Sequence, residues 1–161
     1  MINAMAQKRL TIDYQEYASM AEMEEADRSL LERAVKATEG SYAPYSHYHV
    51  GAAVLLSDGT VVAGANQENS AFPSGLCAER TALFAAHAQY PHLAVRAIAI
   101  TACSNGRMVS EPAWPCGACR QVLADSQRRA GTPVRIIVGG LSRIVVFSCV
   151  DDVMPFIFNG L

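Results

Sequence analysis

The sequence lacks features that would indicate several whole classes of protein. No apolar run approaches the roughly 18 residues that suggest a membrane-spanning helix. The opening residues, MINAMAQKRLTIDYQEY, contain no apolar stretch of the kind that directs secretion. A formal net charge of −2 offers no basic surface for a polynucleotide backbone. We therefore expect a cytoplasmic protein that binds neither a membrane nor nucleic acid.

Internal repeats, low-complexity tracts and obvious linkers are also lacking, and a chain of 161 residues is the usual size of one domain. Apolar residues make up 51% of the chain, which excludes a disordered protein. Residues 1–26 carry only a weak strand pattern, so we treat them as an N-terminal extension of unclear role. The main domain is expected over residues 27–161.

Hydrophobic periodicity predicts alternating helices and strands in the main domain. Three helices are expected, over residues 28–39, 77–90 and 116–129. Asp27 is the expected N-cap of the first helix, and Gly131 is expected to end the third. Apolar runs on both sides of Asp58-Gly59 predict a hairpin, and the expected strands cover residues 50–56, 60–66, 94–103, 134–140 and 143–149. Because these runs are almost wholly apolar, we expect an α/β fold in which helices cover both faces of a sheet.

The five cysteines are the most informative residues of the chain. An odd number does not form a secreted disulfide framework, and closely spaced cysteines in a reducing cytosol more often bind metal or take part in catalysis. Cys116 and Cys119 begin a predicted helix, where a spacing of three residues puts both on one face. A redox pair with this spacing is expected near the N-terminus of a thioredoxin-like fold, whereas this pair lies late in the chain. A metal site is therefore the favoured interpretation.

Cys77 is the third candidate ligand, because it also begins a predicted helix, where the positive end of the helix dipole favours a thiolate. Cys103 and Cys149 end apolar strands and are more typical of packing residues. Three protein ligands and an open position are typical of a catalytic zinc ion that holds water. Glu79 is a candidate acid–base group beside that water, although spacing alone does not orient its side chain.

The segments CAER and PCGACRQ together resemble the two motifs of the zinc-dependent cytidine deaminases. A cysteine at the first ligand position is similar to the small homotetrameric class that acts on free nucleosides, and differs from the histidine-ligated editors of nucleic acids. The segments YSHYHVGAA and NQENSAF are similar to further family segments, so the resemblance covers residues 27–158. It implies a helix–sheet–helix sandwich around a five-stranded mixed sheet, and makes residues 27–161 the catalytic domain.

The resemblance also implies how the metal site works. One zinc ion per chain would be held by Cys77, Cys116 and Cys119, and hydroxide formed on it would attack C4 of the pyrimidine. Glu79 would take the proton of the water, protonate N3 and later deliver a proton to the departing amine. Arg80 would donate hydrogen bonds to the zinc-bound sulfurs and offset the charge of three thiolates.

The substrate-binding residues are implied in the same way. Asn66 and Glu68 match the residues that hold the ribose hydroxyls of the nucleoside. Tyr48 and Phe158 match aromatic positions that pack on the base. Phe72 stands where the family often has a tyrosine whose hydroxyl reaches the 5′-hydroxyl of a nucleoside in a neighbouring subunit, so that contact is in question here.

The implied function is hydrolytic deamination of cytidine and deoxycytidine to uridine and deoxyuridine in pyrimidine salvage, and nothing in the sequence ranks ribose against deoxyribose. One alternative is a related zinc deaminase of another free base or nucleoside analogue, against which the ribose-like NQEN segment argues. Another is a binding module with a structural zinc ion, in which Cys103 or Cys149 would be the fourth ligand. Either Phe158 or Phe156 could be the C-terminal aromatic residue that packs on the pyrimidine base.

Overall fold

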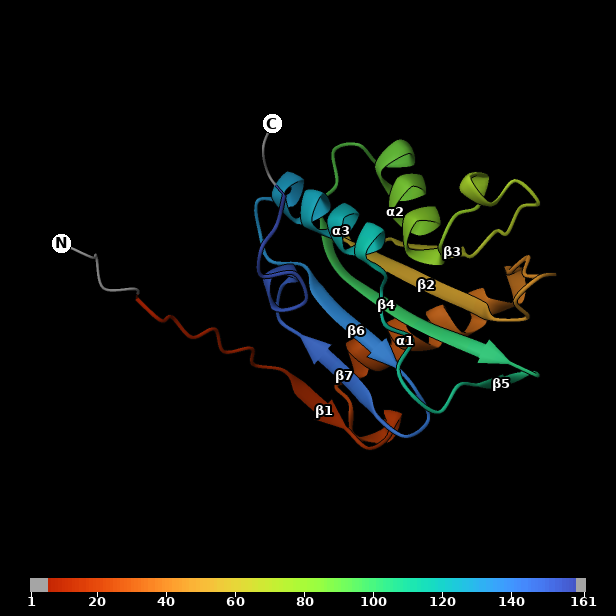
Figure 1. Cartoon of the computed structure of the whole chain (residues 1–161), viewed down its shortest axis with the longest axis horizontal. Helices are drawn as coiled ribbons and strands as arrows, with labels where there is room; N and C mark the ends of the chain where they lie inside the picture. The colour runs from red at the N-terminus through yellow and green to blue at the C-terminus, as the bar shows by residue number, and fades with distance from the viewer. Residues whose placement is uncertain (1–5, 159–161) are drawn as a thin grey trace.

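A mixed β-sheet forms the middle layer of the protein, and helices pack on both of its faces (Figure 1). The computed structural model describes residues 6–158. Residues 1–5 of the predicted extension and 159–161 of the predicted catalytic domain lie outside the described residues. The strands are β1 (Gln15–Tyr17), β2 (His49–Leu56), β3 (Val61–Ala65), β4 (Val95–Ser104), β5 (Arg107–Met108), β6 (Arg135–Gly139) and β7 (Ile144–Phe147). The α-helices are α1 (Glu25–Ala37), α2 (Ala78–Gln89) and α3 (Gly117–Ala130).

The strands follow one another across the sheet in the order β1-β7-β6-β4-β2-β3, with β5 paired to the end of β4. β4 and β6 are parallel, and the other paired strands are antiparallel. The five longer strands are those expected from the sequence, so the predicted helix–sheet–helix sandwich around a mixed sheet is confirmed. The predicted strand count is too low, because β5 adds two residues and β1, from the N-terminal extension, adds three.

Helix α1 covers one face of the sheet with a stripe of three buried residues, Leu30, Leu31 and Ala34. The helix begins at Glu25, so the prediction of Asp27 as its N-cap is wrong. Asp27 lies in the first turn of the helix, where its carboxylate accepts a hydrogen bond of 2.8 Å from Nε of Arg135 in β6. An ion pair between helix and sheet, which the local pattern does not reveal, therefore takes the place of the expected cap.

Helices α2 and α3 lie next to each other on the opposite face of the sheet (Figure 1). Helix α2 comes very close to β3 at Gly64, where a Cβ atom would lie 2.5 Å from the backbone nitrogen of Ala82. Helix α3 ends at Gly131, as predicted. Among residues 6–158, no helix has the length and apolar character needed to cross a membrane.

Candidate active site

The N-terminal ends of α2 and α3 bring three cysteines together. Cys77 immediately precedes α2, Cys116 immediately precedes α3, and Cys119 lies in the first turn of α3. Their sulfur atoms all lie within 4.8 Å of one another, and those of Cys116 and Cys119 are 3.5 Å apart. Two thiolates that bind one tetrahedral zinc ion at about 2.3 Å lie about 3.8 Å apart, so the three sulfurs fit a shared zinc ion.

The charges around the cluster favour a cation. Hydrogen bonds from the thiol of Cys119 and from Arg80 lower the pKa of Cys77 to about 5, so this residue is a thiolate at neutral pH. The same contact with Cys77 raises the pKa of Cys119. Nη2 of Arg80 lies 3.6 Å from Sγ of Cys77, which is the only hydrogen bond of the Arg80 side chain within residues 6–158. The arginine therefore has the sulfur contact that the resemblance implied.

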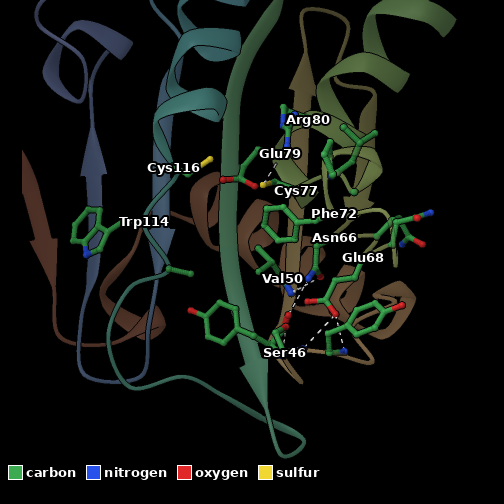
Figure 2. A pocket seen from close by; sticks show the side chains of 18 of the residues that line it. Ser46, Val50, Asn66, Glu68, Phe72, Cys77, Glu79, Arg80, Trp114 and Cys116 are labelled. Carbon is green, nitrogen blue, oxygen red and sulfur yellow. Dashed lines mark hydrogen bonds between the residues drawn. The ribbon is translucent and has the colours of Figure 1, made fainter.

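Glu79 lies in the first turn of α2 and is 4% exposed. Figure 2 shows its carboxylate directed toward the sulfurs of Cys77 and Cys116. Burial, together with the negative charge of Cys77, raises the pKa of Glu79. A carboxylate with a raised pKa is a stronger base than an ordinary glutamate, and its protonated form can still return the proton, as an acid–base catalyst must. The structure therefore shows the direction of the Glu79 side chain, which the spacing of the motif did not determine.

A cavity of about 960 Å³ opens beside the cluster (Figure 2). Its volume lies near the upper end of the range usual for small-molecule sites. Eight of the residues predicted from the sequence line it: Tyr48, Asn66, Glu68, Phe72, Cys77, Glu79, Arg80 and Cys116. Cys119, the third cysteine of the cluster, is fully buried and does not line the cavity. The structure thus brings two of the three predicted metal ligands, the acid–base group and four of the five predicted substrate residues to one cavity, with the third ligand buried next to it.

The side chain of Asn66 joins three segments of the pocket wall. Its Oδ1 accepts hydrogen bonds from Oγ of Ser41 at 2.5 Å and from the backbone nitrogen of Val50 at 2.8 Å. Its Nδ2 donates to the backbone oxygen of Tyr48 at 2.9 Å. In this part of the described chain, one hydrogen of the amide has no protein acceptor and can serve a ligand.

Glu68 stands on a loop at the mouth of the pocket. One carboxylate oxygen accepts hydrogen bonds from the backbone nitrogens of Tyr45 at 2.9 Å and Ser46 at 3.3 Å. Contacts with the side chain of Ser46 and the backbone of Tyr45 lower the pKa of Glu68, so it is ionised at neutral pH. The other oxygen has no hydrogen-bond donor among residues 6–158 and remains available to a hydroxyl group.

Only two of the aromatic residues considered for substrate binding line the pocket. Tyr48 is half exposed at the pocket, and Phe72 lines the pocket but is 90% exposed. Phe158 is 70% exposed and lies away from this pocket, beside α3, where its backbone oxygen accepts a hydrogen bond from Gln121. Phe156, the competing aromatic, is 87% exposed and is also absent from the pocket. One chain therefore does not bring either C-terminal phenylalanine to its own cavity.

Sequence reasoning missed two of the aromatic residues that line the pocket, Tyr45 and Trp114. Trp114 stands two residues before Cys116, and its ring contacts Phe147 edge-on with a centroid distance of 6.2 Å. The sequence did contain a signal for Trp114, because it is the single tryptophan of the chain and lies in the segment that leads into the second cysteine motif. Tyr45 had no comparable signal, since it lies in a loop rich in tyrosine, serine and histidine.

The remaining cysteines do not complete a four-ligand site. Within residues 6–158, the group of ligand-type side chains that could hold a metal contains Cys77, Cys116 and Cys119 but neither Cys103 nor Cys149. Sγ of Cys149 instead contacts Asp152 at 3.4 Å. A structural zinc ion with four cysteine ligands is therefore disfavoured, and the open position of a catalytic site is retained.

Comparison with known proteins agrees with this site. A family model described as the cytidine and deoxycytidylate deaminase zinc-binding region matches residues 24–132. A cytidine deaminase of Halalkalibacterium halodurans is 40% identical over 131 residues, which cover 81% of this chain and 92% of that protein.

Solved structures support the same assignment. The cytidine deaminase of Burkholderia pseudomallei superimposes with a TM-score of 0.68 and 36% identity, covering 81% of this chain and 97% of that one. The cytidine deaminase of Mycobacterium tuberculosis gives a TM-score of 0.63 and 34% identity, covering 83% of this chain and 96% of that one. The zinc-binding description of the family fits the three converging sulfurs, so zinc is the cofactor. The chain belongs to the family of zinc-dependent cytidine and deoxycytidylate deaminases.

Proposed function

We propose that this protein is a cytidine deaminase, which hydrolyses cytidine and deoxycytidine to uridine and deoxyuridine with release of ammonia. The observation that carries the proposal is the buried Glu79 beside three converging cysteines at the edge of an open cavity. Relatives named cytidine deaminase, one of them 40% identical over most of its length, support the same activity.

The chemistry at the metal end follows from the residues. When bound by the three sulfurs, zinc supplies a Lewis acid that makes water reactive at neutral pH. Glu79 takes a proton from the attacking water and gives it to the ring nitrogen N3. It then takes the proton of the hydroxyl group that has been added to C4 and gives it to the departing amine, which leaves as ammonia. Its raised pKa suits this exchange, because it makes the carboxylate a stronger base than an ordinary glutamate. Arg80 offsets part of the negative charge that three thiolates bring to the site.

The other end of the cavity suits a sugar. Glu68 offers a free carboxylate oxygen and Asn66 a free amide hydrogen, and together they can hold the hydroxyl groups of ribose or deoxyribose. Tyr48 would pack on the base. Arg80 is the only basic side chain among the residues that line the pocket, and it is bonded to Cys77. A nucleoside is therefore favoured over a nucleotide, whose phosphate would lack a cationic partner.

The assembly and location belong to the same proposal. The protein would be a cytoplasmic homotetramer in which neighbouring subunits complete each site. The high exposure of Phe72 and Phe158 supports this arrangement, because both aromatic rings are left to solvent in a single chain. Closed symmetry of this kind is common among soluble enzymes.

A substrate panel tests the function. The purified protein, with its zinc content quantified, is mixed separately with cytidine, deoxycytidine, cytosine, deoxycytidylate and a blasticidin-type analogue, and ultraviolet absorbance and ammonia release are recorded. We expect rapid turnover of the two nucleosides and slow turnover of the other three compounds. Absence of turnover of cytidine in a fully zinc-loaded sample would contradict the proposal. Faster turnover of the analogue would favour the related zinc deaminase.

A further inference from the structure

We propose that the N-terminal segment Tyr14–Tyr17 is a brace that positions one wall of the active-site pocket, residues 111–116. This inference rests on the proposed function, because the wall is the part of the pocket that leads into the zinc ligand Cys116. The family model begins at residue 24, so the brace lies outside the region that it matches. We assign Tyr14 as the main positioning residue of the brace.

An aromatic chain of contacts joins the brace to the wall. The ring of Tyr14 lies 5.7 Å from that of Phe147, and Phe147 lies 6.2 Å from Trp114 in an edge-on arrangement. Both distances are within the range in which aromatic rings attract one another. Phe147 is 8% exposed at the end of β7, so its ring is held by packing between the rings of Tyr14 and Trp114. In Figure 2, Trp114 stands on the β7 side of the pocket.

Strand β1 holds Tyr14 in this position. It pairs antiparallel with β7, with Gln15 opposite Val146 and Tyr17 opposite Ile144. This register carries the next residue, Tyr14, to the end of β7, where it meets Phe147. The aromatic contact is therefore a consequence of the strand pairing, and an unpaired N-terminal segment would not make it.

The turn between β6 and β7 forms hydrogen bonds with the first residue of the wall, Glu111, and with Ser110 before it. The backbone nitrogen of Ser142 donates to the oxygen of Ser110 at 2.9 Å, and Oγ of Ser142 donates to Glu111 at 2.8 Å. A Cβ atom on Gly140 would lie 2.5 Å from the backbone oxygen of Ser110, so turn and wall are in close contact. The wall is thus attached to the turn that leads into β7, the strand that pairs with β1.

A second link between brace and wall is ionic. Arg143 lies 3.2 Å from Glu16 of β1 and 3.1 Å from Glu111 of the wall. All three side chains are well exposed, and exposed ion pairs contribute little. We therefore expect the aromatic contact to dominate and the ionic link to add a smaller effect.

Pro112, Ala113 and Trp114 line the cavity, so the residue that contacts Phe147 is itself part of the pocket lining. A pocket wall that is fixed before the substrate arrives lowers the ordering cost of binding. Loosening it should therefore weaken substrate binding more than the chemical step, which depends on Glu79 and the cysteines. The extension would act on KM while leaving kcat largely intact.

The single tryptophan of the chain makes the test direct, because Trp114 can be excited selectively. In the full-length, zinc-loaded protein, Tyr14→Ala should shift the emission to longer wavelength, since more of the indole becomes exposed to water. The KM for cytidine should rise about fivefold, with kcat changed by less than about twofold and zinc content unchanged. Tyr14→Phe should restore both the emission and the KM, because the ring contact needs no hydroxyl.

Matched variants separate the brace from general effects of the extension. Leu10→Ala removes an exposed side chain from the N-terminal extension outside the brace, and should behave as the native protein. Glu16→Gln should raise KM by a smaller factor than Tyr14→Ala, and Glu32→Gln, on the exposed face of α1, should leave it unchanged. Native emission in Tyr14→Ala, or shifted emission with a native KM, would overturn the proposal. If the native protein did not deaminate cytidine, the proposed function would fail, while the emission comparison would still decide whether the brace holds Trp114.

Discussion

The two ends of the pocket differ in how much of each is built by a single chain. At the metal corner, defined here as Cys77, Glu79, Cys116 and Cys119, the side chains converge and only Cys116 is exposed. At the open rim, defined as Tyr48, Asn66, Glu68 and Phe72, the side chains stand on loops, next to strand ends or in the short 3-10 helix Phe72–Ser74, and Phe72 is 90% exposed. The metal corner is complete in one chain, whereas the rim leaves a large part of the cavity open to solvent.

The physical reason lies in the supporting structure. The residues of the metal corner stand at the first turns of two helices that pack on the buried face of the sheet. Packing of this kind holds side chains within narrow limits, as a metal ion requires. The rim depends on loops, which lie at the surface and can be completed by a second chain. One subunit thus provides the geometry for chemistry, while enclosure of the substrate is left to loops and, as we propose, to neighbouring subunits.

The largest effect is expected from breaking the metal corner with Cys116→Ala. Loss of a ligand should abolish zinc binding and turnover, and should lower the melting temperature. Structural zinc contributes roughly 10–16 kcal/mol in small zinc-finger peptides, against a total stability of about 5–15 kcal/mol for a domain. Because this chain also has a large apolar core, we expect a weakened fold rather than an unfolded one. Zinc analysis and calorimetry provide the measurement.

Cys103→Ala is the matched control for this variant, since Cys103 lies in β4 outside the sulfur cluster. It should keep one zinc ion per chain and nearly native activity. A Cys116→Ala protein with full zinc content and an unchanged melting temperature would remove Cys116 from the ligand set.

The next largest effect is expected from Glu79→Gln, which keeps the shape of the metal corner and removes the proton carrier. Turnover of cytidine should fall by at least about a hundredfold, because general acid–base catalysis contributes about 10²–10⁴-fold. Zinc content and the melting temperature should stay native. Glu25→Gln, in the exposed first turn of α1, is the control for loss of a glutamate charge at a helix start. Nearly native turnover in Glu79→Gln would exclude this residue from the mechanism.

A smaller effect is expected at the rim, from Glu68→Ala. A site that binds a substrate hydroxyl leaves its own polar groups unpaired when that hydroxyl is missing, so native protein should strongly prefer cytidine over cytosine. In Glu68→Ala, the ratio of cytidine turnover to cytosine turnover should fall by about tenfold, because cytidine is turned over more slowly. Turnover of cytosine should not change and serves as the internal control. Equal turnover of cytosine and cytidine by the native protein would refute the assignment of Asn66 and Glu68 to ribose.

The smallest effect is expected from Phe72→Ala, which tests whether the rim is shared between subunits. Light scattering after size exclusion should give native protein a mass near four times 17.3 kDa. Outside hot spots, a truncated interface side chain costs about 1 kcal/mol or less, so the concentration at which the tetramer dissociates should rise by up to about fivefold. Activity should be lost together with the tetramer, before the chain unfolds. A fully active monomer would contradict the shared-site proposal and return Phe158 to the status of a surface residue.

Much of the metal corner was predictable from local spacing. Helix periodicity and the positions of Cys77, Cys116 and Gly131 predicted where two helices begin and one ends, and the structure confirms those positions to within a residue. The i, i+3 spacing of Cys116 and Cys119 implied a shared face, because a single helical turn leaves little choice. The five main strands were predictable for the same reason, since a run of apolar residues is a local signal.

Other features depended on parts of the chain that are distant in sequence. Asp27 was expected to cap a helix, but its ion pair with Arg135 forms only once α1 packs on the sheet. The pairing of β1 with β7, and hence the contact between Tyr14 and Phe147, depends on a strand register that three weakly patterned residues cannot specify. The inward direction of the Glu79 carboxylate likewise depends on how α2 lies against the sheet.

The cysteines that could bind the zinc ion, the order of helices and strands and the family were thus predictable from sequence patterns, because each is encoded within a few neighbouring residues. Three features became visible only in the folded chain: Trp114 lines the pocket, Phe158 lies away from the cavity of its own chain, and residues 15–17 of the N-terminal extension join the sheet. These contacts join segments far apart in the chain, and their energies come from packing that exists only after the sheet has formed.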